Sequence, residues 1–171
     1  KDVITYSKPD NKINEIILFI KKLIRTGEQI FWVCPLIEES KKIDHQSSIK
    51  RYEILKKIFN KRVGLLHGSL KKEEKDKILT DFLEKKIDIL VSTTVIEVGI
   101  DFPNASAIII ENANKFGLSQ LHQLRGRVGR GEKQSYCILL FKSTLSENAK
   151  KRINILKKNH DGFKISEEDM K

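Results

Sequence analysis

The chain alternates between short, uninterrupted apolar runs and longer amphipathic segments. Apolar runs at residues 30–36, 63–66, 87–92, 106–111 and 135–141 predict strands, and residues 3–6 predict a shorter one. Strands without polar alternation are buried on both faces, as in a parallel sheet covered by helices. Apolar residues at helical spacing predict helices at 13–24, 49–60, 71–85 and 118–127. The pattern therefore predicts an α/β doubly wound sheet with helices on both faces.

The pattern changes after Phe141. Residues 146–159 predict a Lys-rich helix, residues 161–171 are polar, and neither resembles another strand-helix unit. Residues 38–48 are polar and predict a loop or the start of a helix. We therefore expect one domain over residues 1–142 and a separate helical segment over residues 143–171, in a chain that is a fragment of a longer protein.

The net charge of +10 comes from 33 basic and 23 acidic residues, and the sequence pI is about 9.5. An excess of this size attracts polyanions such as nucleic acids. A Lys-rich surface without a polyanionic partner would give the same balance, because Lys is the main contributor. Charge alone leaves both interpretations open.

The two cysteines, Cys34 and Cys137, each lie inside an apolar run. Neither has a Cys or His at metal-ligand spacing, so we expect two buried structural thiols and no metal site of their own. The sequence contains no signal peptide and no apolar run of membrane length. A cytoplasmic protein that does not bind membranes is therefore expected.

The run QLRGRVGR at residues 123–130 carries the clearest chemical signal. Arg127 and Arg130 each follow a glycine, and a backbone without side chains lets a ligand approach closely. Planar guanidinium groups suit phosphate oxygens and stabilise the charge that develops during phosphoryl transfer. A glycine-rich loop with solvated arginines is the alternative, and both Gln123, three residues before Gly126, and the helix expected to lead into the run argue against it.

The run STTVIEVGIDFP at residues 92–103 directly follows a predicted strand. Ligands of doubly wound sheets bind beyond the carboxyl ends of the strands, so the hydroxyls of Thr93 and Thr94 are well placed for a phosphate. Gly99 and Asp101 follow at the same edge. The alternative is a Ser/Thr cap that opens a short helix.

The run VGLLHGSL at residues 63–70 is another strand end that opens into a helix. His67 could contact a nucleic-acid backbone, but a histidine in this position more often bonds within its own loop. The sequence also lacks GxxxxGK[ST], and no acidic cluster that would bind Mg²⁺ follows a strand. Arginines directed at phosphate cannot complete an ATP site without such a loop.

Three of these segments occur in the order of the motifs of a known family. FWVCPLIEES at 31–40 resembles motif IV, STTVIEVGIDFPNA at 92–105 motif V, and QLHQLRGRVGR at 120–130 motif VI. The chain thus resembles the C-terminal RecA-like domain of superfamily 2 helicases. This implies a three-layer RecA-like fold related to P-loop NTPases but without its own P-loop. PLIEES, HGSLKKEEK and GLSQLHQLRGRVGRG most resemble the RecG family of branch-migration helicases.

The resemblance implies an ATP site shared with a preceding motor domain of the same polypeptide. ATP and Mg²⁺ would be bound mainly by that domain. Arg127 and Arg130 would be arginine fingers that reach the γ-phosphate, and Gln123 would help to position them. Gly99 and Asp101 would lie beside the ribose. An isolated fragment is then expected not to hydrolyse ATP.

The resemblance also implies a DNA-facing surface. Thr93 or Thr94 would hold a phosphate of the tracked strand, and His67 and the PLIEES loop would lie on the same edge. The partner would be branched or forked duplex DNA, as at replication forks and Holliday junctions. The tail would begin a helical translocation hairpin. No role transfers to Arg125, whose offset from Arg127 suggests a domain contact.

Two alternatives remain at this point. The motor half of a transcription-repair coupling factor shares the run around Arg127 almost equally well. A non-enzymatic basic module that binds nucleic acid would share the charge but not a nucleotide site. A P-loop and an acidic Mg²⁺ motif encoded upstream of Lys1 would favour either motor over the non-enzymatic module.

Overall fold

The computed structural model describes residues 3–35, 41–60, 62–93, 104–128, 133–142, 151 and 154–155. Strands and helices alternate along most of this length. The elements are β1 (Val3–Pro9), the 3-10 turn η1 (Asp10–Lys12), α1 (Ile13–Arg25), β2 (Gln29–Cys34), α2 (Lys41–Phe59), β3 (Val63–Leu66), α3 (Lys72–Leu83), β4 (Ile89–Thr93), β5 (Ala105–Ile110), the 3-10 turn η3 (Ala113–Lys115), α4 (Leu118–Arg125) and β6 (Ser135–Phe141).

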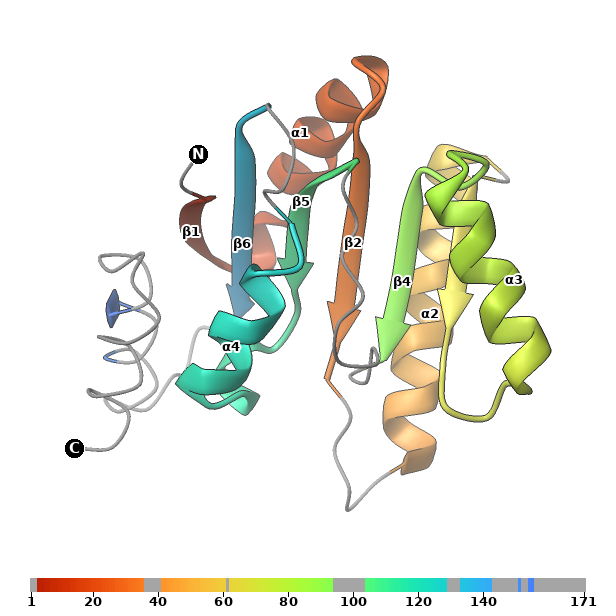
Figure 1. Cartoon of the computed structure of the whole chain (residues 1–171). Coiled ribbons are helices and arrows are strands. Elements are labelled where there is room, and N and C mark those ends of the chain that lie inside the picture. Colours follow the sequence, from red (N-terminus) through yellow and green to blue (C-terminus); the bar gives the residue numbers. More distant parts are fainter. Residues whose placement is uncertain are drawn as a thin grey trace.

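The strands form one six-stranded sheet in the order β1-β6-β5-β2-β4-β3. Each neighbouring pair in this order is parallel. All six carboxyl ends therefore lie on one edge of the sheet, which is the lower edge in Figure 1. This arrangement confirms the predicted α/β fold with a parallel sheet.

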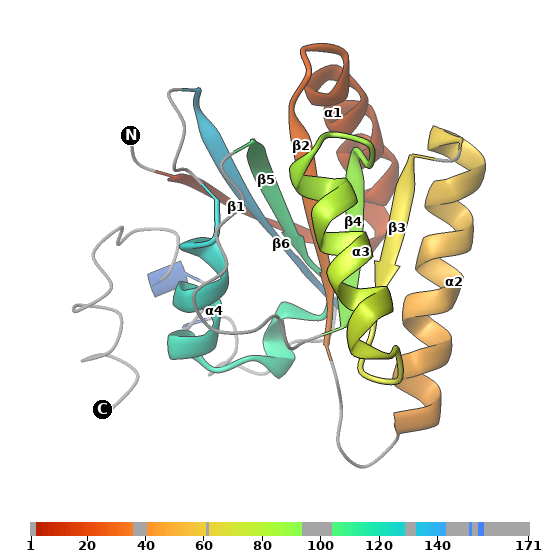
Figure 2. The ribbon, with the colours of Figure 1, turned by 45° about the vertical axis from the view of Figure 1, so that its right-hand side comes forward.

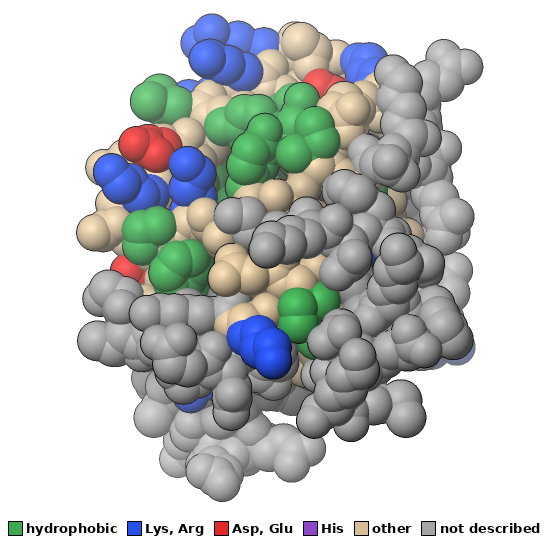
Figure 3. Space-filling view, turned by 90° about the vertical axis from the view of Figure 1, so that its left-hand side faces the viewer, with side chains coloured by type: hydrophobic (Ala, Val, Ile, Leu, Met, Phe, Trp, Pro, Cys, Tyr) green, Lys and Arg blue, Asp and Glu red, His purple; other side chains and the backbone are tan. Residues whose placement is uncertain are grey.

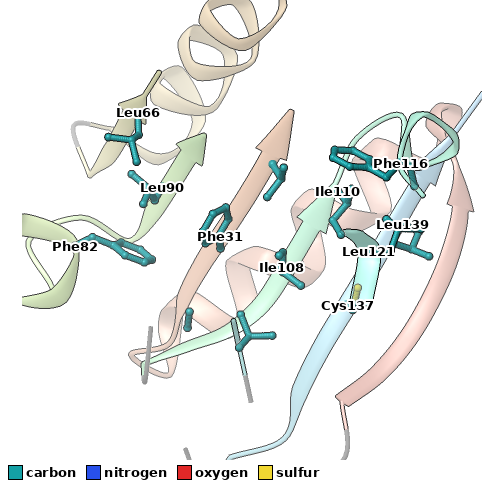
Figure 4. Packing of buried hydrophobic residues seen from close by; sticks show 14 of the residues in the cluster. Phe31, Leu66, Phe82, Leu90, Ile108, Ile110, Phe116, Leu121, Cys137 and Leu139 are labelled. Carbon is teal, nitrogen blue, oxygen red and sulfur yellow. The ribbon is translucent and has the colours of Figure 1, made fainter. Parts of the chain in front are cut away.

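Helices cover both faces of the sheet, with α1 and α2 on one face and α3 and α4 on the other (Figures 1 and 2). Successive strand residues point to opposite faces, so each uninterrupted apolar run supplies two cores. Figure 4 shows the core on the α3–α4 face, where side chains from β2, β3, β4, β5 and β6 meet α3, α4 and the turn before α4. Its labelled members are Phe31, Leu66, Phe82, Leu90, Ile108, Ile110, Phe116, Leu121, Cys137 and Leu139.

The core on the α1–α2 face is formed by the alternate positions of the same strands. Trp32 and Ile109 in the sheet pack with Ile20 of α1 and Leu55 of α2, and all four are fully buried. Burying a large apolar side chain contributes about 1.5–3 kcal/mol. The two cores therefore fix the helices on both faces of the sheet. The residues that follow the carboxyl ends of the strands can then form a functional site.

Most element boundaries differ from those expected by one or two residues, and those of β1 and α2 differ by more. β1 extends to Pro9 rather than residue 6, because its pairing with β6 continues to Phe141. β4 runs from Ile89 to Thr93 rather than over 87–92. α2 begins at Lys41, well before the expected residue 49. Packing of Leu55 anchors this helix, and a helix propagates readily from an anchored segment into a polar one. The expected helix over 146–159 lies largely outside the described residues.

The β1 edge carries an aromatic cluster. The Tyr6 and Tyr136 rings stack with centroids 6.4 Å apart, and Phe19 meets Tyr136 edge-on at 4.9 Å. Tyr6 is 43% exposed. The side of the molecule that carries β1 presents hydrophobic side chains among lysines and arginines (Figure 3). The cluster ties α1 to the outer pair of strands.

Candidate functional site

The carboxyl ends of four neighbouring strands place two of the expected site residues, His67 and Thr93, in one row. Cys34 at the end of β2 pairs with Thr93 at the end of β4, and Leu66 of β3 pairs with Ser92. Val33 pairs with Ile110 on the other side of β2. His67, Thr93, Cys34 and Glu111 therefore follow one another across β3, β4, β2 and β5. The strand order thus brings the ends of four separate sequence segments together.

His67 bonds within its own loop, as the more conservative interpretation of the sequence predicted. Its ring Nδ1 accepts a hydrogen bond from the backbone N–H of Ser69 at 3.2 Å, and its carbonyl accepts one from Leu70 at 3.3 Å. Its side chain is half-buried. These bonds shape the turn between β3 and α3. The contact of His67 with nucleic acid stays a prediction.

Thr93 is 7% exposed, and its side chain points to the α1–α2 face, as does that of its partner Cys34. The hydroxyl therefore lies at the buried end of the strand. Four of the remaining site residues, Thr94, Gly99, Asp101 and Arg130, lie outside the described residues, as do residues 36–40 of the PLIEES loop. Their roles stay predictions.

The helix α4 presents the arginine segment through a regular alternation of buried and accessible positions. Leu118 and Leu121 are buried against the sheet, whereas Gln123 is exposed. After the helix, Gly126 and Arg127 donate backbone hydrogen bonds to the carbonyls of His122 and Leu124, both at 3.0 Å, and Val128 returns to the core with 3% exposure. The half-buried Arg127 is thus held between two anchored positions.

Arg125 is an interior residue. The expectation that it makes a domain contact was therefore wrong. It is 4% exposed, and its Nη2 lies 3.3 Å from Nδ1 of His122. Burial raises the pKa of the Cys137 thiol to about 12, and the nearby Arg125 guanidinium offsets part of this rise. Its offset of two residues from Arg127 turns Arg125 toward the sheet. The two arginines therefore have different environments.

A second polar cluster lies on the opposite face of the sheet, and the sequence interpretation missed it. Glu111 follows β5 directly and accepts hydrogen bonds at Oε2 from Trp32 Nε1 at 2.9 Å and Cys34 Sγ at 3.2 Å. Its Oε1 accepts bonds from Nε and Nη2 of Arg51 at 3.0 and 2.6 Å. The Arg51 guanidinium also lies over the Trp32 ring, 5.3 Å from the centroid. One signal was present, since Glu111 is an acidic residue that ends an apolar run.

Residues 11–132 match the family model described as the helicase conserved C-terminal domain. The chain belongs to this helicase family. The expected order of motifs IV, V and VI agrees with that match, and the six-stranded sheet agrees with the predicted RecA-like architecture.

Curated relatives align with nearly the whole helicase domain. The ATP-dependent DNA helicase RecG of Bacillus subtilis is 47% identical over 99% of this chain, and that of Thermotoga maritima is 49% identical over all of it. These alignments cover 25% and 22% of the two relatives. The resemblance to RecG helicases is therefore confirmed, and the chain spans about a quarter of the length of these relatives.

Solved structures support the same fold. A structure of RecG bound to a three-way DNA junction matches with a TM-score of 0.86 and 46% identity, over 100% of this chain and 22% of that one. Yeast Dbp5 bound to RNA and ADP BeF3 matches with a TM-score of 0.67 over 91% of this chain and 39% of that one. Dbp5 is 22% identical, so that match supports the fold alone.

The described part of this helicase domain offers no grouping of three His, Cys, Asp or Glu side chains suited to a metal ion. None of its described helices is long and apolar enough to cross a membrane. Cys34 and Cys137 are both buried, as expected for structural thiols.

Proposed function

We propose that the full-length protein is an ATP-dependent DNA helicase or translocase and that this chain is its second motor domain. The observation that carries this proposal is the alignment of RecG helicases along nearly the whole chain at 47–49% identity. The related RecG structure holds a three-way DNA junction. The proposed substrates are therefore branched or forked duplexes, such as replication forks and Holliday junctions. The proposed location of the enzyme is the cytoplasm.

The arginine segment after α4 would supply this domain's part of ATP hydrolysis. Arg125 and Val128 anchor the turn from inside, so Arg127 is presented by a backbone of defined geometry. In the proposed enzyme Arg127 and Arg130 reach the γ-phosphate of ATP bound by a preceding motor domain. Pre-oriented guanidinium groups stabilise the transition-state charge without reorganising during the reaction. Gln123, exposed on α4, would position them from the same side.

The remainder of the nucleotide site would come from the preceding domain. This chain has no P-loop, and its described residues contain no group suited to a metal ion, so ATP and Mg²⁺ would be bound mainly across the cleft. Gly99 and Asp101 would approach the ribose from this side. The proposed role of the domain is thus to sense and stabilise the γ-phosphate.

The carboxyl edge of the sheet would also hold DNA. Of the two expected threonines, Thr93 is buried, so Thr94 would bind a backbone phosphate, and His67 lies at the end of the neighbouring strand. Residues 143–171 would begin a helical hairpin that couples cleft closure to duplex DNA. In this tail, Ile155 packs against the core of the α3–α4 face. Closure on ATP and reopening after hydrolysis would then move the held DNA relative to the first domain.

The test is ATP turnover by the full-length enzyme in the presence of forked DNA. Arginine fingers contribute about 10³–10⁵ in rate, so we expect Arg127→Ala and Arg130→Ala each to lower kcat by at least about a thousandfold. Lys115→Ala removes the same charge from an exposed position near α4 and should retain normal turnover. Near-normal turnover in both arginine variants would refute the assignment.

A further inference from the structure

The carboxyl edge contains a hollow whose charged lining residues have no role in the function proposed above. It has a volume of about 260 Å³ and lies where β2 and β5 end against α2. Its lining includes Lys50 and Arg51 of α2, Cys34 of β2, and Glu111 and Asn112 after β5. The described part of the lining therefore combines two cations with one carboxylate at the edge of the sheet that carries Thr93.

The carboxylate in this hollow is already engaged. Trp32 and Cys34 donate to Oε2 of Glu111, and Arg51 donates twice to Oε1. An ion pair with Arg51 at 2.6 Å balances the charge of the carboxylate. The exposed Lys50 then gives the described lining of the hollow a net positive charge. The ligand that fits this charge is an anion.

Arg51 is oriented before any ligand arrives. Its bonds to Glu111 use Nε and Nη2, and neither bond uses Nη1. The ring of Trp32 supports the guanidinium from one side, and the side chain retains 20% exposure. A guanidinium fixed in this way loses little rotamer freedom when it binds a phosphate oxygen, so less of the interaction energy is lost to ordering.

The position and size of the hollow favour a phosphodiester over a whole nucleotide. Cys34, which lines it, pairs with Thr93 of the next strand, and neighbouring strands lie about 4.8 Å apart. From Thr93 to the end of β5 is therefore roughly 10 Å, which a DNA strand rising about 3.4 Å per nucleotide spans in about three nucleotides. Small-molecule sites usually exceed about 300 Å³, whereas one phosphate with part of its sugar needs less.

We propose that Lys50 and Arg51 form a DNA phosphate-binding pocket at the ends of β2 and β5, with Glu111 as the residue that positions Arg51. This rests on the proposed function, because it assumes that DNA crosses the carboxyl edge near Thr93. The pocket extends the path of the DNA across β2 toward β5. The charges of its described lining suit a backbone phosphate, which carries no sequence information of its own.

The test compares two lysines of the same helix in the full-length protein. Lys50→Gln removes a pocket charge at an exposed position, where the substitution leaves the core intact. Lys57→Gln is the matched control, since Lys57 is also exposed and lies two turns, roughly 10 Å, further along the same side of α2. Lys50→Arg preserves the charge. Binding to a forked duplex is measured as a function of salt concentration, with no nucleotide present.

A lost phosphate contact lowers the steepness of log K against log salt by about one. We expect this change for Lys50→Gln, and wild-type steepness for Lys57→Gln and Lys50→Arg. Turnover should stay normal in the control Lys57→Gln, whereas Arg127→Ala should lose turnover and keep the wild-type steepness, which separates this proposal from the proposed function. Equal steepness in Lys50→Gln and Lys57→Gln would overturn the pocket alone. Weaker ATP binding by Lys50→Gln without DNA would assign the hollow to nucleotide and overturn it too.

Discussion

Each face of the sheet has an arginine beside a buried cysteine, but one of these arginines is partly exposed and the other is buried. On the α1–α2 face, Arg51 pairs with Glu111 near Cys34 and keeps 20% of its side chain exposed. On the α3–α4 face, Arg125 is 4% exposed and lies near Cys137 and the His122 ring. The first arginine is held where a ligand can reach it, and the second lies in the core beneath α4.

This comparison shows that the place of a residue on its helix or turn decides whether it stabilises the core or can contact a ligand. Arg51 approaches the strand end from a helix, so its guanidinium meets a carboxylate at the edge of the core. Arg125 lies on the inner side of α4, and Arg127, two residues later, lies on a turn and is half-buried. A motif with several arginines therefore contains residues that stabilise the fold and residues that can meet a ligand.

The largest effect on stability should come from the Glu111 cluster. Glu111→Ala leaves Trp32 Nε1 and the Arg51 guanidinium without their acceptor, and losing one partner of a largely buried pair costs about 2–4 kcal/mol. The measurement is the free energy of unfolding of the chain in urea. Glu111→Gln retains an amide oxygen as an acceptor and should lose about half as much. An equal loss in both variants would contradict a role for these hydrogen bonds.

A smaller loss is expected on the other face from Arg125→Met. Methionine fills the space of the arginine stem but removes the guanidinium and its hydrogen bonds, at a cost of about 1–2 kcal/mol. Arg127→Met is the matched control, because it makes the same change at a half-buried position and should lose less than about 0.5 kcal/mol. Urea unfolding measures both. A larger loss in Arg127→Met would reverse the assigned environments of the two arginines.

The smallest effects should distinguish the two cysteines. The Cys34 thiol donates to Glu111 at 3.2 Å, so a serine hydroxyl can replace it and Cys34→Ser should change stability by less than about 0.5 kcal/mol. Cys137 is fully buried in the apolar core of the α3–α4 face, and Cys137→Ser should cost about 1–2 kcal/mol for the desolvated hydroxyl. Thermal unfolding of both variants checks the order. Equal midpoints would show that the two sites have similar polarity.

The apolar runs were sufficient to predict the sheet and most of the helices, because a strand buried on both faces has no polar alternation. The predicted runs at 63–66 and 135–141 match β3 and β6 in their bounds. The start of α2 was predicted eight residues too late, at 49 rather than Lys41, because its first part has little apolar pattern. The local pattern of apolar residues shows which positions pack into the core, so it gives little information on where a polar helix begins.

For the candidate site, sequence reasoning identified segments better than individual side chains. The strand ends at His67 and Thr93 do lie side by side, as the parallel architecture required. The burial of Arg125 was not predicted, because the motif contains several arginines and spacing alone does not show which one faces the sheet. Arg51 carried no local signal, since it lies in a polar helix 60 residues before its partner Glu111.

The amino-acid sequence by itself determined the parallel α/β class, the family and the segments that carry chemistry, because these depend on local periodicity and short motifs. The tertiary structure alone decided that β5 lies beside β2, which brings Glu111 to Trp32 and Cys34 across 79 and 77 residues of chain. Contacts at such separations depend on strand order. Strand order follows from how whole faces pack, and no single segment encodes it.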